Sequence, residues 1–494
     1  MTSSRTTKRL VNHGEFNERI DHLKSVHPED NTKYSSDDIG AARLFYTTFG
    51  HRCKYNTDRG IWLIYDGKRW AMDKSETMIH ELAQEFRDVL YHYTYTVAEA
   101  KRKEFEKNVT RLGDRNRRVK MIQDARPLCA AQENDFDRDP DLLNCQNGVL
   151  RLSTGELLQH DPALMLTKIC NASYSPGTIS QQWEAFVDQI MQGDHEKKEY
   201  LQRIAGYGIS GTNEQETMFM LYGASSRNGK STFLETIAYV LGDYADTISP
   251  ESLAAGRNKN GAAASPDIAK LNGVRFLKCS EPEKKMVINP VLFKNLTGGD
   301  SITARELYQR PFTFRPQFKL FMNTNYLPTI NDPTIFSSKR VNVLSFDRHF
   351  EDQEQDKSLK YRLRGEKNSS AVLTWLVEGY KTYLARGVVS PAAVVEATKQ
   401  YEEKSDKIGM FLEECYIRDP DELVKLSNAY DLYRRWCSAN GYGTDGKTSF
   451  KQYFMDRGLL EATGWTGKYT AHNVIKGYKP DPEEVHNYWD VVPQ

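Results

Sequence analysis

The sequence predicts an α/β fold for the central part of the chain. The apolar run MFMLY (218–222) has the length of a buried strand, and apolar residues recur at helical spacing over 231–241. Between the two stands GASSRNGKST (223–232), a turn that contains Gly-Lys-Ser. A strand, such a turn and a helix, in this order, form a phosphate-binding unit.

The loop fits the phosphate-loop template in its Ala/Gly form, Ala224-x4-Gly229-Lys230-Ser231. Gly229 lets the backbone turn closely around phosphates, Lys230 would reach the β and γ phosphates of ATP, and Ser231 would hold Mg²⁺. A structural turn is the alternative, which the flanking strand and helix disfavour. The expected ATP-binding residues are Ala224, Ser225, Ser226, Arg227, Asn228, Gly229, Lys230, Ser231 and Thr232.

Three further polar positions border apolar runs downstream of the loop. Glu281 follows GVRFLKC (273–279), where a carboxylate would polarise the attacking water, and Asn325 closes FKLFMNTN (318–325), where it would bind the γ-phosphate. Arg340 immediately precedes the apolar run VNVLSF. Each also has an ordinary interpretation, as a surface glutamate, a turn asparagine or a solvated arginine.

Length, charge and cysteines set broad limits. The 494 residues are enough for two to four domains, and 67 basic residues balance 67 acidic ones, so no overall field favours nucleic acid or membrane. Seven scattered cysteines show no metal or redox spacing, and no apolar leader or membrane-length stretch is present. We therefore expect a cytoplasmic protein with reduced thiols and no membrane partner.

Residues 1–180 are predicted to form a mixed α+β unit. GIWLIYDGKRWAMD (60–73) has two apolar runs around Asp66-Gly67, a hairpin signal, and LLNCQNGVLRLSTGELLQHDP (142–162) is a second turn-rich β segment. The helical stretch 101–120 carries nine Lys/Arg against three Asp/Glu, which fits a solvated face and a nucleic-acid-contacting face equally. The aspartates of DFDRDPD (135–141) are interpreted as structural rather than catalytic.

Residues 401–494 are predicted to form a third unit. EEKSDKIGMFLEECY (402–416) is interpreted as a linker, and two helices and a two-stranded wing are expected over 426–442, 449–460 and 468–479. Nine basic against five acidic residues over 422–480 suit binding to duplex DNA; an assembly or partner-docking role is the alternative.

The order of these segments resembles the superfamily 3 helicases, in their phage, plasmid and poxvirus-type primase-helicase branch. The matching text is SEPE (280–283), KNLTGGDSITARELYQRPFTFRPQFKLFMNTNYLP (294–328) and SSKRVNVLSF (337–346), besides the loop and residues 135–157. The resemblance implies an AAA+-like phosphate-loop ATPase core with a preceding helical collar over 181–400, flanked by the α+β N-terminal unit and a C-terminal winged-helix domain.

The resemblance also implies roles for single residues. Glu281 would be the catalytic acid, Asn325 the sensor, and Arg340 a finger that completes the site of the next subunit in a ring, most simply a homo-hexamer. Ser280 stands where relatives with two carboxylates have an acid. Mg²⁺ would then rely on Ser231, phosphate oxygens and water.

The segment SITARELYQRPFTFRP (301–316) is expected to form a hairpin that points into the channel of the ring. Its tip residues Tyr308, Gln309 and Arg310 would contact DNA by stacking and charge. Arg305, on the rising strand, would contact DNA or serve as a salt-bridge partner.

Together these features predict an ATP- and Mg²⁺-dependent DNA helicase acting on single-stranded and forked DNA, with the family's 3′ to 5′ polarity. Its setting would be replication of a phage, plasmid or mobile element in a bacterial cytoplasm. A primase would be a separate partner, because no primase domain is evident. The alternatives are an origin-melting initiator or DNA-remodelling ATPase without processive unwinding, and a non-catalytic DNA-binding ring with structural ATP.

Overall fold

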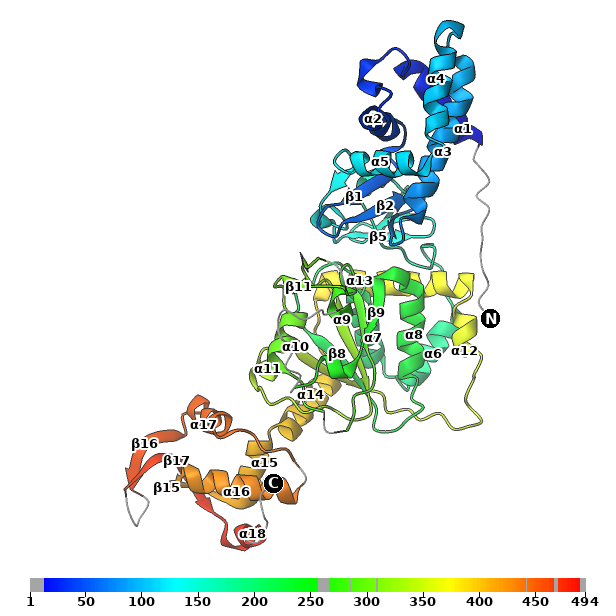
Figure 1. Cartoon of the computed structure of the whole chain (residues 1–494). Helices are drawn as coiled ribbons and strands as arrows, with labels where there is room; N and C mark the ends of the chain where they lie inside the picture. The colour runs from blue at the N-terminus through cyan, green and yellow to red at the C-terminus, as the bar shows by residue number, and fades with distance from the viewer. Residues whose placement is uncertain are drawn as a thin grey trace.

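The computed structural model describes residues 13–255, 266–284, 286–307, 310–440, 442–465 and 470–488. Figure 1 shows three units that follow one another along an elongated molecule, from the N-terminal unit at the top to the C-terminal unit at the lower left. None of the helices within these ranges is both long and apolar enough to cross a membrane.

The N-terminal unit packs helices against a small sheet of order β3-β2-β1-β4. Phe45, Trp62 and Phe86 are fully buried in its core. Tyr65 of β2 pairs with Trp70 of β3 across Asp66-Gly67, which confirms the predicted hairpin. The elements are α1 (His13–Val26), α2 (Asp38–Phe49), β1 (Cys53–Asn56), β2 (Ile61–Tyr65), β3 (Trp70–Asp73), α3 (Thr77–Tyr93), α4 (Glu99–Arg111), α5 (Arg115–Ala125) and β4 (Ala130–Ala131).

A second small sheet joins this unit to the centre of the molecule. It consists of β5 (Leu142–Cys145), β6 (Gly148–Arg151) and β7 (Glu156–Leu158), all antiparallel. Leu143 and Leu150 are buried in the same apolar cluster as the helices of the central unit. The central core therefore begins upstream of residue 181, where the sequence suggested a boundary.

The central unit contains a five-stranded parallel sheet of order β14-β8-β13-β10-β9. Its strands are β8 (Met218–Tyr222), β9 (Ala245–Ile248), β10 (Phe276–Cys279), β13 (Lys319–Thr324) and β14 (Val341–Ser345), and β11 (Ile302–Ala304) and β12 (Phe312–Phe314) form a separate hairpin. The helices are α6 (Gln181–Ile190), α7 (His195–Tyr207), α8 (Lys230–Leu241), α9 (Pro266–Ala269), α10 (Pro290–Thr297), α11 (Thr334–Ser337), α12 (Leu359–Leu363), α13 (Glu366–Arg386) and α14 (Ala392–Ser405).

Both faces of this sheet are covered, which explains why its three inner strands, β8, β13 and β10, are mostly apolar and buried. Phe219 and Leu221 of β8 point into one buried cluster, with helices α7, α8 and α13, while Met218 and Met220 point into the other. The carboxyl ends of the parallel strands therefore meet at one edge of a rigid layer.

The C-terminal unit is a three-stranded antiparallel sheet of order β15-β17-β16 with helices packed on it. Its elements are α15 (Lys407–Cys415), β15 (Tyr416–Lys425), α16 (Leu426–Ala439), α17 (Lys447–Asp456), β16 (Leu460–Trp465), β17 (Thr470–Pro480) and α18 (Pro482–His486).

The prediction of a linker over 402–416 was wrong, because residues 402–405 end α14, residues 407–415 form α15 and Tyr416 begins strand β15. The pairing of β15 with β17 shifts register between Arg418 and Leu423, around Pro420, which has no N–H to donate. Because β15 contains a proline and several charged residues, its sequence lacks the apolar periodicity that would have predicted a strand. All seven cysteines are free and buried, as expected.

Two glycines set the closest helix contact of the central unit. A Cβ on Gly206 of α7 would lie 2.2 Å from the backbone nitrogen of Tyr380 in α13, and one on Gly379 would lie 2.2 Å from the carbonyl oxygen of Gln202. The two backbones pack directly against each other, so neither position has room for a side chain.

We therefore expect Gly206→Ala to destabilise the central unit by about 1–3 kcal/mol, because an added methyl group must push α7 and α13 apart. Calorimetric unfolding of the full chain measures this. Gly299→Ala is the control, since a Cβ there meets no atom within 4 Å. Equal melting temperatures for the two variants would contradict this account of the α7–α13 contact.

Candidate nucleotide site and hairpin

The loop of residues 223–229 joins β8 to α8 at the carboxyl edge of the sheet. Gly229 caps α8 with a φ of +82°, a conformation that favours glycine. Residues 224–227 are exposed, and Asn228 braces the loop by donating from Nδ2 to the carbonyl oxygen of Ser225 at 2.7 Å. The open loop and the first N–H groups of α8 form a cradle suited to phosphate.

Gly223, to which the sequence analysis gave no role, packs against the centre of this loop. A Cβ there would lie 2.0 Å from Asn228 Nδ2 and 2.8 Å from Lys230 Nζ. The glycine that precedes the template is therefore needed to let these two side chains approach the strand. Its position directly after an apolar strand could have indicated this role from the sequence.

Lys230 lies at the centre of the site. Its side chain is buried, and Nζ donates to Asn325 Oδ1 at 2.7 Å and to the carbonyl oxygen of Gly223 at 3.4 Å. Burial lowers the pKa of this lysine to about 8, and the charge of Glu281 opposes that shift. The predicted residues Lys230, Asn325 and Glu281 thus meet at one place, although Glu281 itself is exposed.

Strand order explains this convergence. Asn325 follows β13 and Glu281 follows β10, and these strands lie side by side next to β8. Parallel neighbours end at the same edge, so residues about a hundred positions apart approach one another.

Ser231 is exposed at the start of α8, and its Oγ accepts a hydrogen bond from Asn323 Nδ2 at 3.1 Å. Asn323 was not singled out from the sequence, although a polar residue within an apolar strand near its carboxyl end could have marked it. A serine hydroxyl beside a phosphate cradle fits Mg²⁺ bound also by phosphate and water. Glu283 is exposed two residues beyond Glu281.

The segment after β14 holds the outer side of the loop. The backbone N–H of Phe350 donates to the carbonyl oxygen of Arg227 at 2.9 Å, and His349 Nδ1 lies 2.9 Å from the carbonyl oxygen of Ser226. Arg227 forms an ion pair with Asp352. The loop is thus supported from both β8 and β14.

Arg340 lies at the opposite edge of the sheet, immediately before β14. Its guanidinium pairs with Glu216 and donates to Thr297 Oγ1 at 3.2 Å. Crossing the five residues of β14 covers roughly 16 Å. Arg340 therefore does not reach the Lys230 site of its own chain.

The predicted hairpin is confirmed by the pairing of β11 with β12, in register from Ile302↔Phe314 to Ala304↔Phe312. Arg310 is exposed near its tip, and Arg305 is half-buried. Tyr308 and Gln309, the other expected DNA contacts, lie outside the described residues. DFDRDPD (135–141) serves structure, as interpreted: Asp137 accepts the N–H of Thr167 at 2.9 Å and Asp141 that of Ser153 at 2.8 Å.

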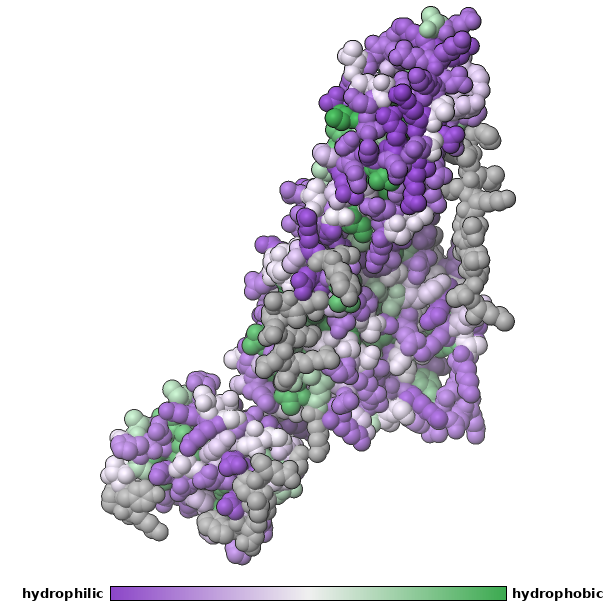
Figure 2. All heavy atoms as spheres, viewed as in Figure 1, coloured by the Kyte–Doolittle hydropathy of each residue, from purple (hydrophilic) through white to green (hydrophobic). Residues whose placement is uncertain are grey.

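The basic stretch of the N-terminal unit exposes a row of cations on α4. Lys103, Lys107 and Arg111 are exposed, and none has an ion-pair partner among the described residues. By contrast, Lys101 pairs with Asp30, and Arg117 lies 3.5 Å from Asp38. Figure 2 shows a predominantly hydrophilic surface at this upper end of the molecule.

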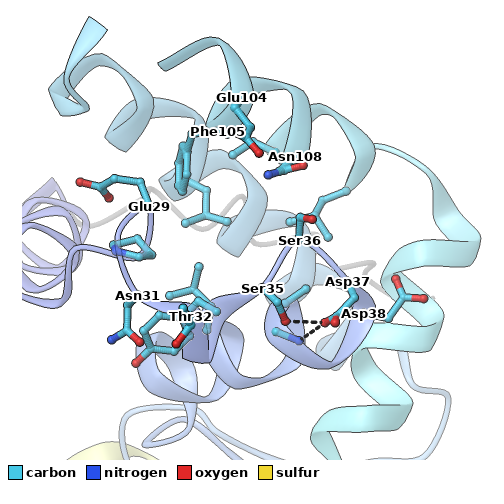
Figure 3. A pocket seen from close by; sticks show the side chains of 18 of the residues that line it. Glu29, Asn31, Thr32, Ser35, Ser36, Asp37, Asp38, Glu104, Phe105 and Asn108 are labelled. Carbon is cyan, nitrogen blue, oxygen red and sulfur yellow. Dashed lines mark hydrogen bonds between the residues drawn. The ribbon is translucent and has the colours of Figure 1, made fainter. Parts of the chain in front are cut away.

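A cavity of about 360 Å³ lies on the other side of α4 (Figure 3). Its lining includes Glu29, Asp38 and Glu104, while Asp37 accepts bonds from Ser35 Oγ at 2.9 Å and Gly40 N at 2.7 Å as the cap of α2. These carboxylates repel phosphate, so the cavity is unsuited to ATP or a DNA backbone.

Three family descriptions match separate parts of the chain. Residues 42–192 match "D5 N terminal like", residues 221–340 a family of unknown function (DUF5906), and residues 403–491 "Poxvirus D5 protein-like". The first and the last of these segments are therefore similar to parts of D5 proteins.

Similar curated proteins come from large DNA viruses. The putative helicase L207/L206 of Acanthamoeba polyphaga mimivirus is 28% identical over 439 residues, which cover 80% of this chain and 45% of the relative. The putative helicase 022R of Frog virus 3 is 28% identical over 292 residues, covering 56% and 30%, and the putative primase C962R of African swine fever virus is 23% identical over 338 residues, covering 62% and 34%.

The chain thus spans less than half the length of these relatives. They come from viruses of eukaryotes, so they give no support to the bacterial host expected from the sequence. Among solved structures, the apo C-terminal region (305–718) of NrS-1 is similar in fold, with a TM-score of 0.50 and 9% identity over 90% of this chain and 100% of that one.

The lowered pKa of Lys230 predicts a pH-dependent affinity for ATP. The charged ammonium binds phosphate, and with a pKa of about 8 only about one molecule in ten carries that charge at pH 9. The Kd of a non-hydrolysable ATP analogue, measured by fluorescence titration, should therefore rise about tenfold from pH 7 to pH 9.

Lys230→Arg is the control for this titration, because a guanidinium stays charged over the whole range. Its Kd should be independent of pH. A constant Kd for the unmodified chain would show that Lys230 does not bind the phosphates.

Proposed function

We propose that the chain is the ATP- and Mg²⁺-dependent motor part of a D5-type DNA helicase of superfamily 3. The observation that carries this proposal is the contact of Lys230 with Asn325, beside Glu281, at the carboxyl edge of the parallel sheet. A phosphate-loop strand inside an all-parallel sheet, next to the strand of Asn325, supports an AAA+-like core.

In this proposal different residues of the chain bind the phosphates, activate the attacking water and hold Mg²⁺. Backbone N–H groups of the loop and Lys230 bind the β and γ phosphates, and Asn325 holds Lys230 and the γ-phosphate in place. Glu281 accepts the proton of the water that attacks the γ-phosphorus, while the bond to the β-phosphate oxygen breaks. Mg²⁺, held by Ser231, would neutralise charge on the phosphate oxygens.

Arg340 would complete the site of a neighbouring subunit. Its position at the far edge of the sheet supports action in trans, and a ring, most simply a homo-hexamer, is the assembly that gives every site such a neighbour. The hairpin of β11 and β12 would then face single-stranded or forked DNA with Arg305, Tyr308, Gln309 and Arg310.

The C-terminal unit is proposed to be a winged-helix domain. Helix α15, strand β15, helices α16 and α17, and the pair β16–β17 follow one another in the order that such a domain requires. Lys447 and Gln452 of α17 are exposed, which suits contact with duplex DNA. A separate primase remains the proposed partner.

The test of the whole proposal is strand displacement on forks with either a 3′ or a 5′ tail. We expect DNA-stimulated ATP hydrolysis and unwinding of the 3′-tailed fork. Hydrolysis without unwinding of either fork would favour an initiator or remodelling ATPase. Binding of ATP and DNA without any hydrolysis would favour a regulatory ring.

Glu281→Gln isolates the chemical step. The amide keeps the size of the side chain but cannot accept the proton, so ATP binding should be unchanged while hydrolysis falls by about 10²–10⁴-fold. The neighbouring Glu283→Gln is the matched control and should retain hydrolysis. If the two variants hydrolyse ATP equally, Glu281 is not the general base.

The cation row on α4 predicts a second DNA contact outside the channel. Replacing Lys103, Lys107 and Arg111 by glutamine removes three positive charges. The plot of log K for binding of single-stranded DNA against log salt concentration should then become less steep by about 2, since each lost phosphate contact contributes about 0.7 to its slope. Fluorescence anisotropy at several salt concentrations measures this.

The control variant has glutamine in place of Lys101 and Arg117, which already pair with Asp30 and Asp38. It should leave the slope unchanged. If the variant at Lys103, Lys107 and Arg111 also leaves the slope unchanged, these residues form an ordinary solvated helix face and do not contact DNA.

A further inference from the structure

Arg59 connects the N-terminal unit to the hairpin of the central unit. It lies in the turn between β1 and β2, and its side chain is only 5% exposed. A nearly buried guanidinium must find several partners, because an unpaired charge away from water is strongly unfavourable. The partners of Arg59 come from both units.

The hairpin supplies two of these partners. Arg59 Nη2 donates to Glu306 Oε1, and Arg59 Cζ lies 4.7 Å from the ring centroid of Phe312. Glu306 follows β11 by two residues, and Phe312 is the first residue of β12. The guanidinium therefore contacts both arms of the hairpin just below its tip.

The N-terminal unit holds Arg59 from the other side. Arg59 Nη1 lies 3.6 Å from Glu133 Oε1, and the Glu133 carboxylate also accepts bonds from Asn56 and from Asn272 of the central unit. Burial raises the pKa of Glu133, an effect that Arg59 opposes. The result is a polar junction of two carboxylates, two amides and one guanidinium.

The hairpin and the N-terminal unit do not pack tightly together beside the junction. A cavity of about 170 Å³, lined by Glu133, Asn272 and Phe314, separates β12 from that unit beside the junction. Three residues of the paired strands, Ala304, Phe312 and Phe314, pack into the central core. Arg59 contacts the hairpin at Phe312, within that core, and also at Glu306, beyond the paired strands.

We propose that Arg59 is a positioning residue that fixes the DNA-facing hairpin to the N-terminal unit. Force on the hairpin would then reach the N-terminal unit directly through this guanidinium, and the two would move together. The attachment stands on the contacts above, whereas its consequence for unwinding rests on the proposed function of the hairpin.

Arg59→Ala in the full chain tests the attachment by hydrogen exchange. We expect amides of 302–307 and 310–314 to exchange about tenfold faster or more, as expected when a buried ion pair is broken. Arg69→Ala is the matched control: Arg69 also pairs across the two units, with Asp243, but does not touch the hairpin.

The same variants test the consequence for DNA. Arg59→Ala should keep DNA-free ATP hydrolysis and its KM within about twofold while unwinding falls about tenfold, so that more ATP is consumed per base pair. Arg59→Lys should recover part of the unwinding, because it keeps the charge. Arg69→Ala should retain both activities.

The outcomes separate the two claims. Unchanged exchange in Arg59→Ala, or equal acceleration in Arg69→Ala, overturns the positioning role whether or not the chain unwinds DNA. Faster exchange in a chain whose unmodified form never unwinds DNA keeps the attachment and rejects the proposed function. If Arg59→Ala does not fold, Glu306→Ala removes the same contact from the hairpin side and leaves Arg59 paired with Glu133.

Discussion

The buried ammonium group of Lys230 is the constraint on which the central unit depends. A cation in this position needs oxygen partners, and the structure supplies them from two elements: Asn325 after β13 and the carbonyl oxygen of Gly223 at the end of β8. Those partners can meet only if the strands are parallel neighbours with a common edge. The covered sheet, the glycine at 223 and the spacing of the polar residues all serve this requirement.

Much of this arrangement could be predicted from the sequence, because its signals are local. The loop, the strand before it and the helix after it are contiguous in the sequence. Glu281 and Asn325 each follow a strand that can be recognised from its run of apolar residues. Asn323 carries a local signal too, as a polar residue near the end of an apolar strand, but its contact does not follow from the sequence, since its partner Ser231 is 92 residues away and the pairing of β13 with β8 brings them together. Strand β15 was missed because Pro420 and its charged neighbours are compatible with a strand only when β17 fixes the register around them.

Contacts between units were the least predictable part. Nothing near Arg59 in the sequence indicates that its partners lie at 133, 306 and 312, because a buried arginine has the same local signature as a solvated one. The same holds for Arg69 and Asp243. Such pairs form only when one folded unit docks on another. The local periodicity of the sequence carries no information about that docking.

Arg340 already has partners within its own chain. Because Glu216 and Thr297 hold its guanidinium, joining a second subunit through this arginine would exchange one set of partners for another rather than add a new one. The net free energy of such an exchange is small compared with that of capturing a free cation. An assembly that used this exchange would gain little free energy from it, and its subunits would separate readily.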